Sequence, residues 1–386
     1  MRSMVSGVDS TLLLALPLFV LSGNIMGRGG ISKRLFDIFA LLLGRLPGGM
    51  AIAVIFTSVI YAAICGSGPA ATAAVGAMAV PLLVELGYKR DFAATLVASG
   101  GGIGIIIPPS LPFITYAMLT GVSVGALFTA GIIPGLLIAA CLIAYVIFYC
   151  RREGEDRAKV KANYQALVAR GRWRVFKESF FALLSPVIIL GGIYAGVFTP
   201  TEAAVVSVFY SFIICFVVYH SIKWKDVPKI LIESVKGYAG IGILIAISMS
   251  FSRVMAMLNV TTSLANFVTA HFNSTGLLMA IIIVILLVIG MFMDVMPSVT
   301  IFAPILVPIV VAMGIDPVHF GIVLTTLVAV GMLSPPFGMN LYVASGIAKV
   351  PVDQTFKQAY MFCLAYLIAI ILIAYIPGIS LFLGKT

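Results

Sequence analysis

Charged residues are scarce in this chain of 386 residues. Asp, Glu, Lys and Arg make up 10% of it and hydrophobic residues 61%, whereas soluble domains carry about 25% charged residues, so a soluble fold is excluded. A membrane-spanning helix needs about 20 mostly apolar residues. Long apolar runs occur at 11–27, 47–65, 124–150, 179–198, 202–220, 238–257, 276–293 and 358–382. The composition predicts an all-α polytopic membrane protein embedded in a lipid bilayer.

Histidine and cysteine are also rare. The three histidines stand at the edges of apolar runs and the five cysteines are widely spaced, so neither type forms the clusters typical of metal sites or disulfide frameworks. The net charge of +10 could suggest nucleic-acid binding, but Lys and Arg gather between the apolar runs, where the positive-inside rule explains them. We therefore expect no nucleic-acid partner. The apolar run from Thr11 lacks an A-x-A-like cleavage site, so we expect it to be retained.

The chain does contain an internal repeat. Adding 227 to a residue number moves Pro108 and Pro109 onto Pro335 and Pro336, since 335 − 108 = 227. The same offset pairs Pro81 with Pro308, Gly87 with Gly314, Gly104 with Gly331, Ala117 with Ala344, and Ser67 with Asp294. Helix-breaking residues that keep the same spacing in two parts of the chain predict two copies of one structural unit.

Each copy predicts a hairpin followed by a broken helix. An apolar run breaks and returns at 50–65 and 70–86 in the first copy and at 276–293 and 298–313 in the second. Limbs this short favour re-entrant hairpins over full spans. The segments that follow, 92–119 and 320–348, carry the Pro-Pro pairs. Because proline lacks an N–H and clashes with the preceding helical turn, we expect both segments to be discontinuous helices.

Charge predicts the topology. Lys and Arg near the ends of spans mark the cytoplasmic side. They flank the first hairpin, and nine of them lie in 151–178. They return at Lys223, Lys225, Lys229 and Lys236, but none occurs from residue 254 to residue 348. The first hairpin is therefore expected to open toward the cytoplasm and the second away from it, so the two repeats are inverted.

These features divide the chain into five parts. We expect N-terminal scaffold helices at 1–46, a first transport repeat at 47–150, a basic cytoplasmic loop at 151–178, scaffold spans at 179–275 and a second, inverted transport repeat at 276–386. Inverted repeats with broken helices that meet near the midplane are typical of secondary transporters. Irregular backbone at membrane depth is tolerated only inside protein or along a watery cavity, where its carbonyls suit a hard cation.

Seven stretches of the chain carry a family resemblance: LALPLFVLSGNIMGRGGISKRL (14–35), CGSGPAATAAVGAMAVPLLVELGY (65–88), GIIIPPSLPFITYA (104–117), LFTAGIIPGLL (127–137), GVFTPTEAA (196–204), GMFMDVMPSVTIFAPILVPI (290–309) and LSPPFGMNLYVA (333–344). Together they resemble the large membrane subunit of TRAP (tripartite ATP-independent periplasmic) transporters. Large subunits of this family generally carry another apolar segment before the LPLFVLSG-like stretch, which this chain does not show.

The resemblance implies a function. It implies a Na⁺-driven, elevator-type carrier in the bacterial inner membrane for a carboxylate-bearing organic acid, of the C4-dicarboxylate or sialic acid type. It also implies two partners, a small TRAP membrane subunit and a periplasmic substrate-binding protein. The chain is then a transporter and not an enzyme, and Na⁺, the coupling ion, is expected at two sites.

We expect those Na⁺ sites at the two hairpin tips. In the second repeat Asp294 is the main candidate, because a carboxylate at bilayer depth is costly and usually faces a partner or a cavity. A helix-capping role is the simpler alternative for it. Its expected partners are Ser298, Gly331 and Ser334. In the first repeat the expected ligands are Gly66, Ser67 and Gly68 at the tip, and Ser99, Gly102 and Gly104 on the broken helix. Close helix packing is an equally good reason for each of these glycines.

The substrate site is expected between the tips, at the helix breaks. Half-helix N-termini carry partial positive charge that can face a carboxylate. The candidates are Pro108, Pro109 and Ser110 in the first repeat and Pro335, Pro336, Gly338 and Asn340 in the second. Asn340 could instead satisfy backbone groups freed by the break in its own helix.

Three other functional classes fit less well. The CGSG stretch is similar to the GxSG motif of rhomboid proteases, but the spans lack a histidine that could activate Ser67. Two unlike tips, of which one carries Asp294, favour a carrier over a channel. A stand-alone Na⁺/carboxylate symporter of related architecture, which needs no binding protein, is the alternative that only the family resemblance disfavours.

Overall fold

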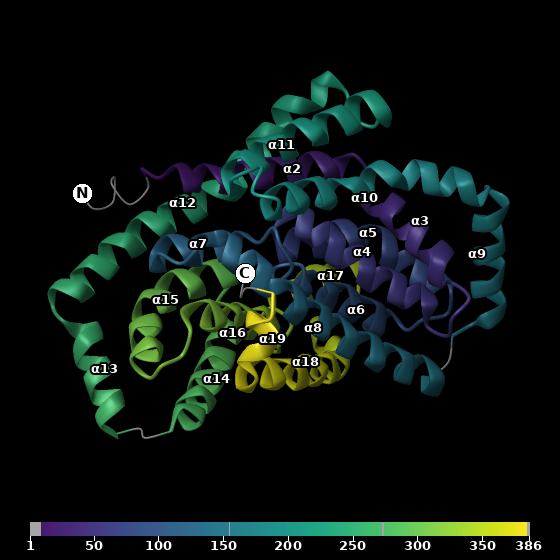
Figure 1. Ribbon diagram of the computed structural model, residues 1–386. Coiled ribbons are helices and arrows are strands. Elements are labelled where there is room, and N and C mark those ends of the chain that lie inside the picture. Colours follow the sequence, from purple (N-terminus) through teal and green to yellow (C-terminus); the bar gives the residue numbers. More distant parts are fainter. Residues whose placement is uncertain (1–8, 154, 272–273, 384–386) are drawn as a thin grey trace.

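The computed structural model describes residues 9–153, 155–271 and 274–383, and every regular element in these ranges is a helix. Nine of the helices described are long and apolar enough to cross a membrane. Shorter apolar helices, such as Leu111–Thr120 and Met339–Ala348, lie among them. The predicted all-α, multi-pass class is therefore confirmed (Figure 1).

The first repeat folds as a helical hairpin, a broken helix and one long span. Its helices are α4 (Gly49–Cys65), α5 (Gly68–Glu85), α6 (Arg90–Ile103), α7 (Leu111–Thr120) and α8 (Val124–Glu153). The hairpin turns at Gly66, whose φ of +64° ends α4, because glycine adopts this left-handed conformation without strain. Ser67 and Ser110 cap the N-termini of α5 and α7, each followed by a proline in the first turn.

The second repeat has the same helices in the same order. They are α14 (Thr275–Phe292), α15 (Val295–Ala312), α16 (Pro317–Gly331), α17 (Met339–Ala348) and α18 (Val352–Tyr375). Shifted by 227 residues, the start of each of these helices lies within one residue of its counterpart in the first repeat. The helix ends agree equally well except that of α18. The structure thus reproduces the internal repeat, whereas the inversion of the repeats across a membrane stays a prediction.

The two repeats pack on each other in matched pairs. Helix α17 packs against α5, and α7 packs against α15; α6 contacts α18, and α16 contacts α8. Helices α8 and α18 also contact each other. In Figure 1, α5, α6 and α17 lie together in the middle of the molecule, while α14, α15 and α16 form a neighbouring group.

The remaining helices lie before and between the repeats. They are η1 (Thr11–Leu14), α2 (Ala15–Arg28), α3 (Ile31–Leu43), α9 (Arg157–Ala169), α10 (Arg172–Tyr194), α11 (Pro200–Phe212), the π-helical η2 (Ile213–Val218), η3 (Trp224–Asp226), α12 (Val227–Met257) and α13 (Val260–His271). A five-residue helix, α19 (Pro377–Leu381), follows α18. Helices α2 and α11 pack through Ser22, Ser207 and Ser211, whose hydroxyls bond to one another. Such polar contacts between small residues hold membrane helices together.

The segment 151–178 differs from the expected loop. Residues 157–169 form helix α9, which runs across the ends of α8 and α10 at one end of the molecule (Figure 1). Asp156 caps α9 by accepting hydrogen bonds from the backbone of Ala158 and Lys159. A search for apolar runs does not detect a polar cap of this kind. Helix α13 was likewise not expected as a separate element.

Glycine permits one very close crossing in the second repeat. A methyl group on Gly331 of α16 would lie 2.1 Å from the backbone carbonyl carbon of Gly290 on α14. The backbones of the two helices therefore touch, and no side-chain movement could make room. We predict that Gly331→Ala lowers the free energy of unfolding by about 1–3 kcal/mol through overpacking. The measurement is the fraction of monodisperse protein in detergent after heating, followed by size-exclusion chromatography.

The matched control is Gly346→Ala on α17. A methyl group there meets no atom within 4 Å, so this variant should melt at or slightly above the wild-type temperature because alanine restricts the unfolded chain. Equal melting temperatures for the two variants would contradict the close crossing.

Candidate functional site

The first hairpin tip lies against the broken helix of its own repeat. Gly66 packs on Leu111 at the start of α7, and Gly68 packs on Ile105 in the segment that joins α6 to α7. Just beyond the tip, α5 crosses α6 at Gly68 and Gly101. A methyl group on Gly101 would lie 2.7 Å from the Gly68 carbonyl oxygen and 2.2 Å from Thr72 Oγ1. Only glycine fits this crossing without displacing backbone.

Asn340, from the second repeat, reaches this crossing. It is fully buried near the start of α17. Its Nδ2 donates a hydrogen bond of 3.2 Å to the Ala98 carbonyl of α6, and this atom would lie 3.2 Å from a methyl group on Gly68 and 3.4 Å from one on Gly101. The site therefore combines elements of both repeats: α5 and α6 from the first and α17 from the second.

Two buried oxygens at this crossing have no hydrogen-bond partner among the described residues. They are Thr72 Oγ1 and Asn340 Oδ1. Buried polar atoms are rarely left unpaired in native proteins. Gly101 is among the last four residues of α6, so its carbonyl has no partner within the helix. Carbonyl, amide and hydroxyl oxygens are ligands suited to a hard cation such as Na⁺.

The other predicted ligands of the first site lie further along α6. Ser99 Oγ donates to the Leu96 carbonyl at 2.7 Å, and the Ser99 carbonyl accepts a hydrogen bond of 2.6 Å from Tyr366 Oη. Gly102 faces Tyr366, and a methyl group on Gly104 would lie 1.7 Å from Cβ of Ala62. Helix packing alone thus requires glycine at 104, and a ligand role for Ser99, Gly102 or Gly104 stays a prediction.

The second tip is built around Asp294. It is the N-cap of α15, and its Oδ1 accepts a hydrogen bond of 2.8 Å from the backbone of Val295. Ser298 Oγ donates to the Asp294 carbonyl at 2.8 Å. The carboxylate is half-buried and forms no ion pair within the described ranges. The capping role weighed above is present, and Asp294 keeps acceptor capacity for a cation.

Gly331 and Ser334, the other expected ligands near this tip, have visible packing roles. Gly331 makes the crossing with Gly290 described above. Ser334 Oγ donates to the Val330 carbonyl at 3.0 Å and lies 3.4 Å from Cys363 Sγ. Their contribution to a cation site stays a prediction.

The two helix breaks differ in exposure. Pro108, Pro109 and Ser110 are buried, and Ser110 bonds within its own turn, as donor to the Ile105 carbonyl and acceptor from the backbone of Phe113. Both Pro-Pro peptide bonds are cis. In the second break Pro335 and Gly338 are buried while Pro336 is exposed. Of the two breaks, the second therefore has exposed residues, while Pro108, Pro109 and Ser110 of the first are buried.

Sequence reasoning missed Thr72 and Gly101. Thr72 lies one helical turn after Gly68, so the two share a face of α5, and that spacing could have suggested it. Gly101 was not among the expected ligands, although it precedes Gly102, which was. Asn340 was expected at the substrate. Its side chain lies beside Gly68 and Gly101, and its substrate role stays a prediction.

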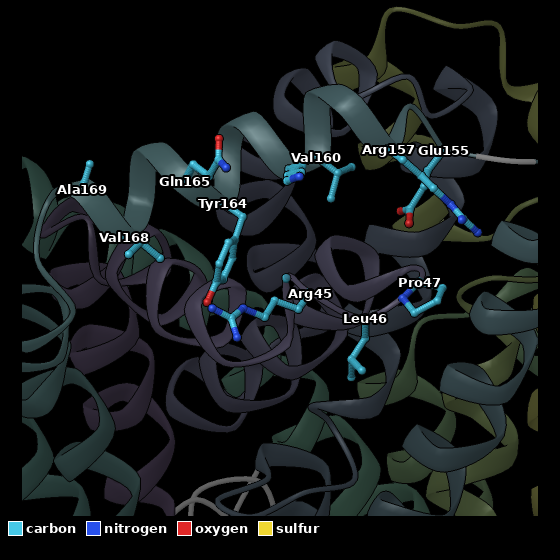
Figure 2. Close-up of a pocket in the computed structure, with 12 residues that line it drawn as sticks. Arg45, Leu46, Pro47, Glu155, Arg157, Val160, Tyr164, Gln165, Val168 and Ala169 are labelled. Atoms are coloured by element: carbon cyan, nitrogen blue, oxygen red, sulfur yellow. The ribbon is translucent and has the colours of Figure 1, made fainter.

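A well-formed cavity lies elsewhere. It has a volume of about 680 Å³ and lies between α9 and the turn that follows α3 (Figure 2). Two smaller cavities of about 370 and 390 Å³ also border α9. Their lining residues include none of the predicted site residues, so the hairpin site is supported by its buried polar groups and not by an open pocket.

Solved structures resemble this fold despite low sequence identity. The Alcanivorax borkumensis YdaH transporter matches with a TM-score of 0.67 at 14% identity, over 98% of this chain and 88% of that one. Neisseria gonorrhoeae MtrF, described among antimetabolite efflux pumps, matches with a TM-score of 0.66 at 14% identity, over 97% and 82%. At this identity the likeness shows the fold alone.

Other proteins share more of this sequence than the solved structures do. The C4-dicarboxylate TRAP transporter large permease protein DctM of Pseudomonas aeruginosa is 38% identical, over 96% of this chain and 85% of that protein. The sialic acid TRAP transporter large permease protein SiaM of Vibrio cholerae is 34% identical, over 100% and 88%. The isethionate TRAP transporter permease protein DctMQ of Oleidesulfovibrio alaskensis is 38% identical over 98% of this chain, which spans 59% of that protein's length.

A family model agrees with these relatives. The model described as "Tripartite ATP-independent periplasmic transporter, DctM component" matches residues 1–379. With its apolar helices, the chain is a multi-pass protein of the bacterial inner membrane, and it belongs to the DctM family of TRAP transporter large permease subunits.

Proposed function

We propose that this chain is the large transmembrane subunit of a Na⁺-driven TRAP secondary transporter. It would import a carboxylate-bearing organic acid that a periplasmic binding protein delivers, in complex with a small membrane subunit. Relatives named for C4-dicarboxylate and sialic acid transport support the substrate class. In the elevator mechanism that we infer, the two repeats move together against the remaining spans.

The observation that carries the proposal is the contact of Asn340 with the first hairpin. The side chains of Thr72 and Asn340 both reach the crossing of Gly68 and Gly101, and each has an oxygen without a hydrogen-bond partner among the described residues. A Na⁺ ion bound by them would join α5 and α6 to α17, which carries the second helix break at its N-terminus. Cation binding in one repeat would thereby fix the substrate-facing end of the other.

Helix electrostatics support the proposed position of the substrate carboxylate at the two helix breaks. The N-termini of α7 and α17 begin at the two breaks, and each carries partial positive charge from the helix dipole. A carboxylate between them would be stabilised without a positively charged side chain. Neutral recognition of this kind is needed here, because no Lys or Arg occurs from residue 254 to residue 348.

The proposal predicts uptake that needs three components. Proteoliposomes containing this chain and its small subunit should accumulate a radiolabelled organic acid only with an inward Na⁺ gradient and the cognate binding protein. A K⁺ gradient of equal size is the control. Uptake that is indifferent to the binding protein would identify a stand-alone symporter instead, and uptake that is indifferent to Na⁺ would refute the ion coupling.

Thr72→Val tests the first cation site. The change keeps the shape of the side chain but removes an oxygen that has no hydrogen-bond partner, so thermal stability without Na⁺ should be unchanged. The Na⁺ concentration for half-maximal uptake should rise about 10-fold or more, the size typical of damaged metal sites. Thr57→Val is the control, because the Thr57 hydroxyl already donates a hydrogen bond of 2.7 Å to the Ala53 carbonyl and is not expected to bind a cation. An unaltered Na⁺ dependence in Thr72→Val would exclude Thr72 as a ligand.

Asp294→Asn tests the second tip. Asparagine caps helices about as well as aspartate, so the variant keeps the cap of α15 and loses only the charge. We expect at least about a 10-fold loss of Na⁺-driven uptake at unchanged protein yield, as for loss of a metal ligand. Asp316→Asn is the matched control, since Asp316 caps α16 at an exposed position by accepting from the backbone of Val318 and His319. Equal uptake by the two variants would leave Asp294 with a capping role alone.

A further inference from the structure

The cavity beneath α9 has no part in the site described above. Its walls are the turn 44–47 on one side and α9 on the other, and its volume is about 680 Å³. Figure 2 shows Arg45, from the turn, next to Tyr164, from α9, toward one end of the cavity, with Arg157 and Pro47 toward its other end. It is open to the surface, so a ligand could enter from outside the helix bundle.

The mouth of this cavity is positively charged. Arg45, Arg157 and Lys161 line it, and all three are exposed. None of them forms an ion pair within the part of the chain that the structure describes. Arg45 lies 5.2 Å from the centre of the Tyr164 ring, a cation–π distance that holds its guanidinium over the cavity.

The one acidic residue in the wall is already engaged. The carboxylate of Glu155 accepts a hydrogen bond of 3.1 Å from the backbone of Gly48 and another from the hydroxyl of Tyr88. Its single negative charge leaves two of the three positive charges of Arg45, Arg157 and Lys161 unbalanced. The cavity is left with a net positive charge that suits an anion.

Most of the rest of the wall is apolar. Leu46, Pro47, Val160 and Val168 line it, and Leu46 is 51% exposed. A small hydrophilic anion would leave these surfaces in contact with water, whereas an amphiphile would cover them. The lining thus matches a ligand with an anionic head and a hydrocarbon tail.

The place of α9 agrees with such a ligand. The helix lies across the ends of α8 and α10 (Figure 1), within the segment that carries nine Lys and Arg. Trp173, four residues beyond the end of α9, is 75% exposed. Exposed tryptophan beside clustered basic residues is typical of the cytoplasmic membrane interface, where lipid phosphates lie.

We propose that this cavity binds an anionic phospholipid. The phosphate is held by Arg45, Arg157 and Lys161, and the acyl chains lie along the apolar wall formed with Leu46 and Val168. Basic pockets at the cytoplasmic side of helix bundles recognise anionic head groups in this way.

The bound lipid would also affect movement. The turn 44–47 and α9 are the two connections that link the expected scaffold helices to the first repeat. The start of α9 is fixed to that repeat, since the backbone of Asp156 donates to the Leu86 carbonyl at 3.3 Å. Its end is fixed to α3, since Arg170 pairs with Asp37 at 2.9 Å. A lipid between the connections would limit their relative motion; this consequence rests on the proposed function, whereas the binding site does not.

Binding is tested on the full-length chain in mild detergent after removal of native lipid. Native mass spectrometry follows titration with palmitoyl-oleoyl phosphatidylglycerol or with the matching phosphatidylcholine. We expect one phosphatidylglycerol to bind more tightly than phosphatidylcholine. A cation near an anionic head group contributes about five-fold in affinity, so Arg45→Gln/Arg157→Gln/Lys161→Gln should weaken phosphatidylglycerol binding about 100-fold, and Lys161→Gln alone, the variant least disruptive to folding, about five-fold.

The matched control is Lys177→Gln/Lys225→Gln/Lys229→Gln. These three lysines are exposed and do not line the cavity, so the control should bind phosphatidylglycerol like the wild type. Three results would each overturn the proposal: equal binding of the two lipids, equal loss in both triple variants, or displacement of the lipid by an equal concentration of glycerol phosphate, which would indicate a site for soluble anions.

The consequence for transport is measured separately. For the wild type, the rate of uptake should differ between vesicles with phosphatidylglycerol and vesicles without it. For Arg45→Gln/Arg157→Gln/Lys161→Gln, the rate should be the same in both. If no uptake occurs in any vesicle while the lipid still binds, the proposed function fails and the lipid site stands. Uptake with the same lipid dependence in both proteins would remove the link between the lipid and movement.

Discussion

Backbone polar groups at membrane depth must find partners inside the protein, and the fold depends on how this chain meets that requirement. Two helices break at their Pro-Pro pairs, and each break exposes donors and acceptors that lipid cannot satisfy. The chain supplies partners locally, as where the backbone N–H of Asn340 donates to the Met332 carbonyl at 3.0 Å. Hydrogen bonds across the repeats also hold the broken helix in place, as where Tyr366 donates to the Ser99 carbonyl of α6. The breaks are tolerated because the repeats cover each other.

Small residues make that cover possible. Where Gly68 meets Gly101, and where Gly290 meets Gly331, no side chain separates the backbones. Close approach brings carbonyl oxygens of different helices into one small volume, which is the condition for a site made of backbone and neutral side chains. The same glycines would then serve both helix packing and the proposed cation site. This is why the sequence alone left the two explanations equally good at Gly102 and Gly104.

Much of the fold could be predicted because helix breakers are local signals. The Pro-Pro pairs and the Gly-rich tip predicted the interruptions between α6 and α7 and between α16 and α17, and the 227-residue offset predicted their equivalence. Helix α9 was missed because it is short and charged, and its N-cap is a polar signal that an apolar scan ignores. The partners at the first tip were missed for another reason. Periodicity places Thr72 and Gly68 on one face of α5, but only the packed structure shows that α6 and Asn340 of α17 lie against that face.

Side-chain hydrogen bonds between the repeats run in both directions. Tyr116 and Tyr145 of the first repeat donate to the Pro317 carbonyl and to Gln358 Oε1 of the second. Asn340 and Tyr366 of the second repeat donate to the Ala98 and Ser99 carbonyls of the first. At the equivalent positions, 227 residues earlier, the first repeat has Phe113 and Ala139, which can donate nothing from their side chains. A pair of first repeats could not reproduce this interface. The two halves of this duplicated chain have become complementary, and neither half could replace the other.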